Sequence, residues 1–421
     1  MKTGGELIVE CLEAQGVDRI FCVPGESYLA VLDGLHGSSI QAVVARQEGG
    51  AAMMAEADGK MTGRPGICMV TRGPGATNAA SGVHVAKQDS TPMIMFVGQI
   101  GRRMKGRDAF QEVDYRQTFG DLAKWVEEID HVDRIPEVIS HAYHVAMSGR
   151  PGPVVLALPE DMLRDVCDAT AGPRVEVAEP APSDLSMEKL AILLTQAKSP
   201  FLLLGGSRWS GQAVADVHTF AENWGLPVGC SFRRQQLFDH LHPNYAGDVG
   251  LGINPKLKQQ IQDSDLVILL GARFSENPSQ GFSLFDIPKA KQTLVQIHPG
   301  AEEIGRIYVP DLPIVATAET FLTAALKLPS SQKFTGFADL NKAYRDWTDE
   351  LPETPGRAQM GPIIETLRDQ HGDAIVANGA GNYAIWVHRF WRFRKFGSQL
   401  APTSGSMGYG LPAAIAGKLR H

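Results

Sequence analysis

The residues of this 421-residue chain that are best placed to take part in chemistry lie in two turns. Each turn joins an apolar strand to a helix. Glu48 follows a β-rich run over residues 40–44 and lies in the first turn of a helix of small residues. The helix dipole and unpaired N–H groups favour a carboxylate there by roughly 0.3–1 kcal/mol. Taken alone, the pattern is more typical of a glutamate that stabilises a helix start.

The second turn is the run Thr71-Arg72-Gly73-Pro74-Gly75-Ala76-Thr77-Asn78, which follows an apolar strand and opens another helix. Backbone amides at such a turn can face an anion. Gly205-Gly206 occupies the corresponding position in the middle of the chain. Neither run has the spacing G-x-G-x-x-G or contains G-K-[ST], so a tight turn is the simpler interpretation of each.

Other chemistries lack a motif. The sequence contains no H-E-x-x-H and no G-x-S-x-G, so nothing indicates a transition-metal site or a hydrolase triad. The five cysteines are scattered and include no C-x-x-C. That usage indicates reduced thiols in a cytoplasmic protein rather than a disulfide framework.

The amino-acid composition indicates the structural class of the protein and excludes some partners. The chain is 43% apolar and 21% charged, with 44 Gly and 26 Pro, which is typical of a soluble, turn-rich α/β protein. Its net charge of −7 includes no basic block, so nucleic acid is an unexpected partner. The longest apolar runs, such as residues 266–270, have the length of strands, so no membrane span is expected.

Strands and helices alternate along the chain, which predicts parallel sheets covered by helices on both faces. We expect an α/β protein of three doubly wound domains. Their predicted bounds are 1–168, 186–328 and 359–421, joined by linkers at 169–185 and 329–358. The third has too few residues for a covered sheet and is expected to be incomplete. The predicted strands of the first two are 19–23, 40–44, 66–70, 92–97, 153–158, 201–204, 227–230, 266–270 and 293–297.

Eight motifs in order resemble the thiamine-diphosphate-dependent acetolactate synthase catalytic subunit and its relatives. They begin with Phe21-Cys22-Val23-Pro24-Gly25, Arg46-Gln47-Glu48 (with Ala51 and Ala52), Thr71 to Asn78, and Asp89-Ser90-x-Pro92. They continue with Gly98-Gln99, the run from Asp108 to Asp114, Gly149-Arg150-Pro151-Gly152-Pro153, and Met407-Gly408-Tyr409-Gly410-Leu411-Pro412. Each motif is weak alone, but their order over the whole chain is specific.

The resemblance implies roles for individual residues. Glu48 would hydrogen-bond the pyrimidine ring of the cofactor and favour the tautomer that acts as its base. Gln111 and Phe110 would shape the reacting face as catalytic residues. Further cofactor contacts are implied for Pro24, Gly25, Gly75, Asn78, Asn382, Tyr383, Gly405, Ser406 and Met407, with Met407 beneath the bent cofactor.

The metal motif of the family is missing. Relatives hold Mg²⁺ and the diphosphate with Gly-Asp-Gly and a later Asn, and this chain contains no Gly-Asp-Gly. No residue here is therefore assigned to a metal, and Mg²⁺ would require a segment beyond His421. Without the cation the diphosphate should lose much of its affinity, so weak cofactor binding and little turnover are expected.

Two further points stay open. The resemblance implies an FAD site only in part, through Ser90, Arg103, Arg150, Gly205, Gly206, Gly271 and Arg273. Its expected acidic residue after Val295-Gln296-Ile297 is replaced by His298. Arg72 stands where many acetolactate synthases have Ser, and Glu160 where they usually have Lys, which leaves the acceptor substrate open.

The sequence therefore predicts decarboxylation of a 2-keto acid such as pyruvate and its joining to a second keto acid, as in branched-chain amino acid biosynthesis. A related decarboxylase or lyase with another acceptor is one alternative, and an inactive truncated chain is the other. Small 2-keto acids are the expected substrates. A homodimer or tetramer, with or without a regulatory subunit, is implied by the resemblance.

Overall fold

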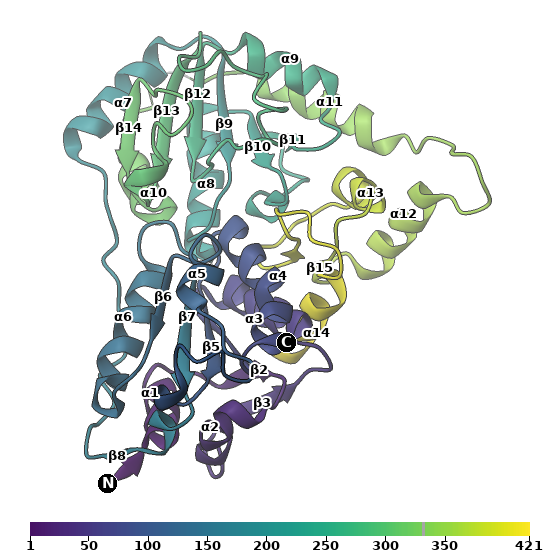
Figure 1. Ribbon diagram of the computed structural model, residues 1–421. Coiled ribbons are helices and arrows are strands. Elements are labelled where there is room, and N and C mark those ends of the chain that lie inside the picture. The colour runs from purple at the N-terminus through teal and green to yellow at the C-terminus, as the bar shows by residue number, and fades with distance from the viewer. Residues whose placement is uncertain (331–332) are drawn as a thin grey trace. The chain divides into compact units, whose positions relative to one another are not determined.

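The computed structural model describes residues 1–330 and 333–421, and the chain forms two compact units (Figure 1). The first unit contains Met1–Ala178, Ala377–Gly379 and Pro402–His421. The second unit contains the described residues of Glu179–Val376 and Ala380–Ala401. Each unit is built on a six-stranded parallel sheet, as the alternation of strands and helices predicts.

The sheet of the first unit has the strand order β3-β2-β4-β5-β7-β6, and every neighbouring pair is parallel. Its central strands are buried on both faces, which explains their continuous apolar sequences. The strands are β2 (Arg19–Cys22), β3 (Gln41–Val44), β4 (Gly66–Val70), β5 (Met93–Gln99), β6 (Trp125–Glu128) and β7 (Pro153–Pro159). The short strands β1 (Lys2–Thr3) and β8 (Val166–Cys167) pair separately.

Helices cover both faces of this sheet. One face packs against α1 (Gly4–Ala14), α2 (Leu29–Gly34) and α6 (Ile135–Met147). The long helices α3 (Glu48–Thr62) and α4 (Pro74–Asp89) pack together so closely that a Cβ on Gly82 would lie 2.4 Å from that of Ala52. The short α5 (Tyr115–Phe119) precedes β6, and the C-terminal helix α14 (Gly410–Arg420) packs against α3.

The sheet of the second unit has the order β11-β10-β9-β12-β13-β14 and is also parallel. Its strands are β9 (Pro200–Leu204), β10 (Val228–Ser231), β11 (Tyr245–Val249), β12 (Leu266–Leu270), β13 (Thr293–His298) and β14 (Leu312–Val315). Its helices are α7 (Asp184–Gln196), α8 (Gly211–Trp224), α9 (Pro255–Asp263), α10 (Ala318–Ala325), α11 (Phe337–Asp349), α12 (Met360–His371) and α13 (Tyr383–Phe390).

The helix expected within the linker 329–358 is α11, and it belongs to the core of the second unit. Leu340, Ala343 and Tyr344 on this helix are buried, and the Asn341 side chain donates to backbone carbonyls at His242 and Tyr245. The described residues of this segment therefore do more than connect two domains.

Residues 359–421 do not form a third compact unit. Residues 359–376 and 380–401 join the second unit, while 377–379 and 402–421 join the first. Their only strands among the described residues are the two-residue β15 (Val376–Ala377) and β16 (Gln399–Leu400). Residues of α12, α13 and the segment after α13 form a small apolar cluster of Ile364, Val387, Phe390, Trp391 and Phe393.

A buried histidine makes the second unit sensitive to acid. His240 is 1% exposed, and its Nε2–H donates to the Gln235 carbonyl at 3.1 Å. Because burial disfavours the charged ring, the pKa of His240 falls from 6.5 to about 3. The unfolded chain therefore binds one more proton than the native one between these two values. His240 alone lowers the free energy of unfolding by about 1.4 kcal/mol per unit as pH falls through this window.

We accordingly expect His240→Phe to flatten the pH dependence of the free energy of unfolding between pH 6.5 and about 4 by one proton. Urea unfolding followed by tryptophan fluorescence measures it, since every tryptophan except Trp125 lies in the second unit. His371→Phe, at an exposed histidine of the same unit, is the control. Equal slopes for the two variants would contradict the prediction.

Across residues 1–330 and 333–421, no helix combines the length and the apolar character that crossing a membrane requires.

Candidate functional site

The candidate site lies at the edge of the first sheet where its parallel strands end. After β2 the chain places β3 on one side and β4 on the other, so the strand order reverses between β2 and β4. Ligands of open α/β sheets bind at such a reversal, outside the carboxyl ends of the strands. The loops after β2, β3 and β4 carry Pro24-Gly25, Glu48 and Gly73-Pro74-Gly75, so the fold brings these predicted residues to one edge.

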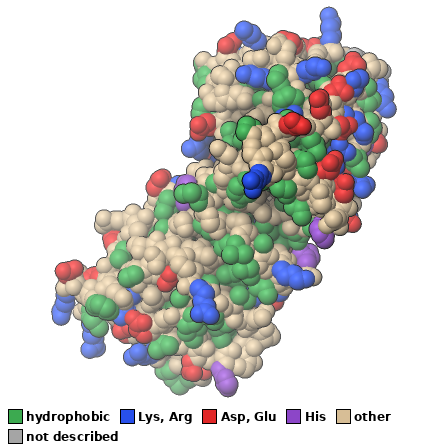
Figure 2. All heavy atoms as spheres, turned by 90° about the vertical axis from the view of Figure 1, so that its right-hand side faces the viewer, with side chains coloured by type: hydrophobic (Ala, Val, Ile, Leu, Met, Phe, Trp, Pro, Cys, Tyr) green, Lys and Arg blue, Asp and Glu red, His purple; other side chains and the backbone are tan. Residues whose placement is uncertain are grey.

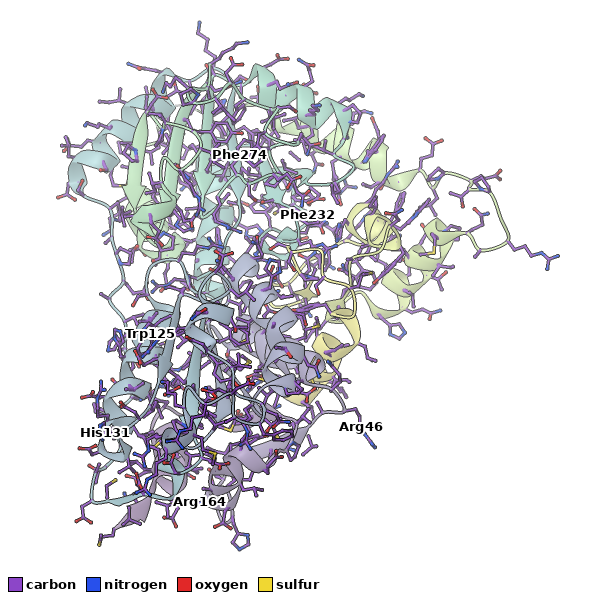
Figure 3. All side chains as sticks on the ribbon, viewed as in Figure 1. Arg46, Trp125, His131, Arg164, Phe232 and Phe274 are labelled. Atoms are coloured by element: carbon purple, nitrogen blue, oxygen red, sulfur yellow. The ribbon has the colours of Figure 1, made fainter. Side chains whose placement is uncertain are left out.

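Glu48 is the first residue of α3, as the sequence predicts. The Gln47 side chain caps the helix by accepting from the Gly50 N–H at 3.0 Å. Arg46, the residue before Gln47, extends into solvent (Figure 3). Asn78 Nδ2 donates to Glu48 Oε2 at 3.0 Å and holds the half-buried carboxylate in place. The second oxygen, Oε1, lies 3.6 Å from the position that a Cβ on Gly75 would take.

Close packing fixes the two glycines beside this carboxylate. A Cβ on Gly75 would lie 2.8 Å from Thr71 Cγ2, and one on Gly25 would lie 2.5 Å from Thr71 Cβ. Thr71 Oγ1 is 2.7 Å from Ser27 Oγ, which joins the loops after β2 and β4. Ser27 and Thr71 were not among the predicted site residues. For Thr71, the residue directly after β4, a hydroxyl beyond a strand end was the available signal; Ser27, within the helical turn Glu26–Tyr28, offered none.

Gln111 packs over the start of α4. A Cβ on Gly73 would lie 2.9 Å from that of Gln111, and the Gly73 N–H donates to Tyr115 Oη at 2.9 Å. Gln111 has φ +66°, a conformation that only a small fraction of non-glycine residues adopt. Its Oε1 is buried and has no hydrogen-bond partner among the residues that the structure describes. Such an orphaned acceptor points to a ligand.

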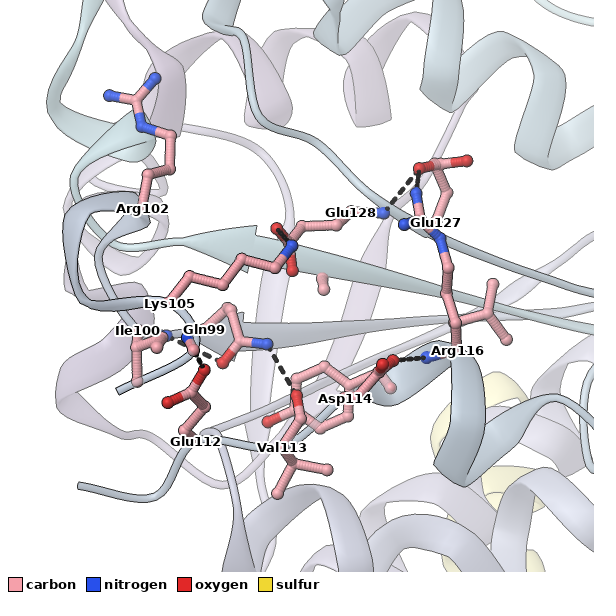
Figure 4. Close-up of a pocket in the computed structure, with 14 residues that line it drawn as sticks. Gln99, Ile100, Arg102, Lys105, Glu112, Val113, Asp114, Arg116, Glu127 and Glu128 are labelled. Atoms are coloured by element: carbon pink, nitrogen blue, oxygen red, sulfur yellow. Dashed lines mark hydrogen bonds and ion pairs between the residues drawn. The ribbon is translucent and has the colours of Figure 1, made fainter. Parts of the chain in front are cut away.

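Charged pairs hold the loop that carries Gln111. A cavity of about 350 Å³ lies between this loop and strands β6 and β7 (Figure 4). Lys105 bonds Glu128 across it at 2.7 Å, and Glu112 accepts from the Gly106 and Ala109 N–H groups. Gln99 Nε2 donates to the Val113 carbonyl at 2.9 Å. These side-chain contacts fix the loop on both sides of Gln111 and so hold Gln111 in place.

Other predicted residues are exposed or lie elsewhere. Phe110 is 76% exposed and Met407 is 84% exposed, with Gly405 and Ser406 beside it. Figure 2 shows hydrophobic side chains exposed on the face seen from the right of Figure 1. Asn382 and Tyr383 belong to the second unit and are exposed. The structure therefore groups Pro24, Gly25, Glu48, Gly75, Asn78 and Gln111 in the first unit, and leaves Phe110 and Met407 at the surface.

The residues proposed for FAD fall into two sets. In the first unit, Arg150 Nε donates to the buried Ser90 Oγ at 2.8 Å, and Arg103 is exposed. In the second unit, Gly205, Gly206 and Gly271 meet at the ends of β9 and β12, and Arg273 follows them.

Packing alone accounts for the three glycines. A Cβ on Gly206 would lie 2.1 Å from the Gly271 carbonyl oxygen, and Trp209 Nε1 donates to the Gly205 carbonyl at 2.8 Å. His298 Nδ1, where the resemblance leads us to expect a carboxylate, accepts from the Gly300 N–H at 2.9 Å. These residues fit a flavin nucleotide poorly.

No group of three or more His, Cys, Asp or Glu side chains that could hold a metal ion occurs within the described part of the chain.

Three domain models of one protein family match parts of the chain. Residues 2–118 match the N-terminal TPP binding domain of thiamine pyrophosphate enzymes, 187–325 match their central domain, and 379–421 match their C-terminal TPP binding domain. An acetolactate synthase of Mycobacterium bovis is 32% identical over 99% of this chain and 69% of its own length. Acetolactate synthase isozyme 1 large subunit of Escherichia coli is also 32% identical, over 99% of this chain and 74% of its own length. The chain thus belongs to the thiamine pyrophosphate enzyme family, in which acetolactate synthase large subunits are its relatives.

Proposed function

We propose that the chain uses thiamine diphosphate to decarboxylate pyruvate and to join the two-carbon product to a second 2-keto acid, as its relatives' name implies. The observation that carries the proposal is the position of Glu48. This carboxylate lies where the strand order reverses, with Oε2 held by Asn78 and Oε1 facing Gly75.

The residues at this edge fit the pyrimidine end of the cofactor. Glu48 Oε1 is available to hydrogen-bond a ring nitrogen, and Gly75, which packs against Thr71, lies beside that oxygen. The orphaned Gln111 Oε1 supplies a polar contact on the far side of Gly73. When bound, the cofactor supplies the nucleophilic carbon that the chain lacks. Glu48 would hold a proton at Oε1, and Gln111 would orient the substrate.

Product analysis tests this proposal. The purified chain is incubated with pyruvate, thiamine diphosphate and Mg²⁺, and products are followed by NMR. Acetolactate is the expected product, formed slowly because the chain contains no Gly-Asp-Gly motif to hold Mg²⁺ and the diphosphate. Acetaldehyde alone would support a related decarboxylase instead, and unchanged pyruvate under saturating cofactor would contradict the proposed activity.

We further propose that a second copy of the chain covers the exposed groups near the site, giving a homodimer or tetramer. Phe110 and Met407 are largely exposed, and so are Leu411 (73%) and Ile415 (42%) of α14. Apolar exposure of this kind favours association. Sedimentation velocity measures it. A regulatory subunit and the Mg²⁺ ion enter the proposal through the resemblance alone, and an absorbance spectrum of the pure protein tests FAD.

A further inference from the structure

An ion pair crosses the candidate site at the ends of β4 and β7. Arg72 follows β4, and Glu160 follows β7 on the other side of β5. Arg72 Nη1 donates to Glu160 Oε2 at 2.9 Å, and the Glu160 N–H donates to the Gln99 carbonyl at the end of β5. The Arg72 side chain is only 11% exposed. The guanidinium therefore spans the edge of the sheet and is largely shielded from solvent.

Part of this guanidinium has no partner. Glu160 takes a single hydrogen bond from Nη1, and Arg72 Nε is buried with no acceptor among the residues that the structure places. A buried, charged N–H without an acceptor is costly, so it indicates a ligand. Nε and Nη2 form one edge of the guanidinium, and that edge matches the two oxygens of a carboxylate.

The unpartnered edge belongs to the proposed site. Arg72 is the residue before Gly73, which contacts Gln111 and donates to Tyr115. The Arg72 N–H itself donates to Ser27 Oγ at 3.2 Å, which ties it to the loop after β2. Two buried atoms without partners, a donor on Arg72 and an acceptor on Gln111, thus flank Gly73.

We propose that Arg72 is a specificity-determining residue that binds the carboxylate of the 2-keto acid through its Nε edge, and that Glu160 positions it. The inference deepens the proposed function and rests on it. Glu160 also competes with the substrate, because it draws on the same positive charge. Removing the charge of Arg72 should therefore weaken carboxylate binding, and removing the charge of Glu160 should strengthen it.

The test uses oxamate, which resembles pyruvate but is not decarboxylated, and its uncharged amide, oxamide. Calorimetric titration of the full chain, with and without thiamine diphosphate and Mg²⁺, should show oxamate binding at least tenfold tighter than oxamide. Arg72→Gln should abolish this preference, and Arg72→Lys should restore part of it. Glu160→Gln should tighten oxamate binding several-fold. Arg134→Gln, which removes an exposed paired guanidinium from the same unit, should change nothing.

A purely structural ion pair predicts another pattern, in which Arg72→Gln and Glu160→Gln weaken binding alike. That pattern would overturn the inference, as would an unchanged oxamate preference in Arg72→Gln or the absence of any preference in the parent chain. A chain that prefers oxamate through Arg72 but makes no acetolactate would overturn the proposed activity and leave the carboxylate site standing.

Discussion

Replacing Glu48 by glutamine is expected to lower the rate of pyruvate consumption by about 10²- to 10⁴-fold, the usual contribution of a positioned acid or base. Glutamine keeps the size of the side chain and can still accept from Asn78 Nδ2, which lies 3.0 Å from Oε2. It cannot, however, hold a proton at Oε1 opposite Gly75. The rate should therefore fall much more than the affinity for thiamine diphosphate. Initial rates at saturating cofactor and calorimetric titration measure the two effects.

The matched control is Glu137→Gln. Glu137 also lies in the first turn of a helix of the first unit, where it is exposed and bonds Arg134 at 2.7 Å. If Glu48 only stabilised its helix, both substitutions would alter stability by less than about 1 kcal/mol and leave the rate alone. Equal rates for the two variants would contradict a catalytic role for Glu48.

The second large effect concerns a buried network on α3. Glu56 and Asp89 are 0% and 1% exposed, and Lys60 pairs with both carboxylates. Tyr409 Oη donates to Glu56 at 2.5 Å, and the Thr403 N–H donates to Asp89 at 2.6 Å. The network therefore ties residues 402–421 to α3 and α4 within the first unit.

We expect Lys60→Met to destabilise the first unit by about 3–5 kcal/mol, because it leaves two buried carboxylates without their cation. At about 2–4 °C per kcal/mol for a unit of this size, the unfolding temperature should fall by roughly 10 °C. Scanning calorimetry measures the shift. Lys87→Met on α4 is the control, since Lys87 pairs with the fully exposed Asp121 and should lose less than about 1 kcal/mol. A shift no larger than that of Lys87→Met would show that the network contributes little.

Periodicity in the sequence predicted the central strands of both sheets and missed strands at their edges. The strands β4, β5, β9 and β12 are continuous apolar runs, because helices cover both of their faces. The missed strands β6, β11 and β14 are all edge strands. Their sequences are WVEE, YAGDV and LPIV. The charged residues, glycine and proline in them are tolerated because an edge strand has a neighbouring strand on one side only.

The sequence predicted the site residues that lie in a single turn between a strand and a helix. Glu48 and Gly75 each lie in the first turn of the helix that follows a strand, so their place at the sheet edge follows from parallel topology. Gln111 lies in a loop with no periodicity, and only the resemblance singled it out. The pairing of Arg72 with Glu160 could not be predicted from the sequence, because 88 residues separate them and only the strand order brings them together. The ties between residues 402–421 and α3 depend on tertiary contacts in the same way.

Deuterium exchange at the reactive thiazolium carbon of thiamine diphosphate tests the role of Glu48 most directly, because it needs no substrate. NMR follows the loss of that proton signal in deuterated buffer at saturating cofactor and Mg²⁺. The parent chain and Glu137→Gln should both accelerate the exchange over free cofactor, and Glu48→Gln should lose that acceleration. An acceleration by Glu48→Gln equal to that of the parent chain would contradict the proposal that Glu48 activates the cofactor.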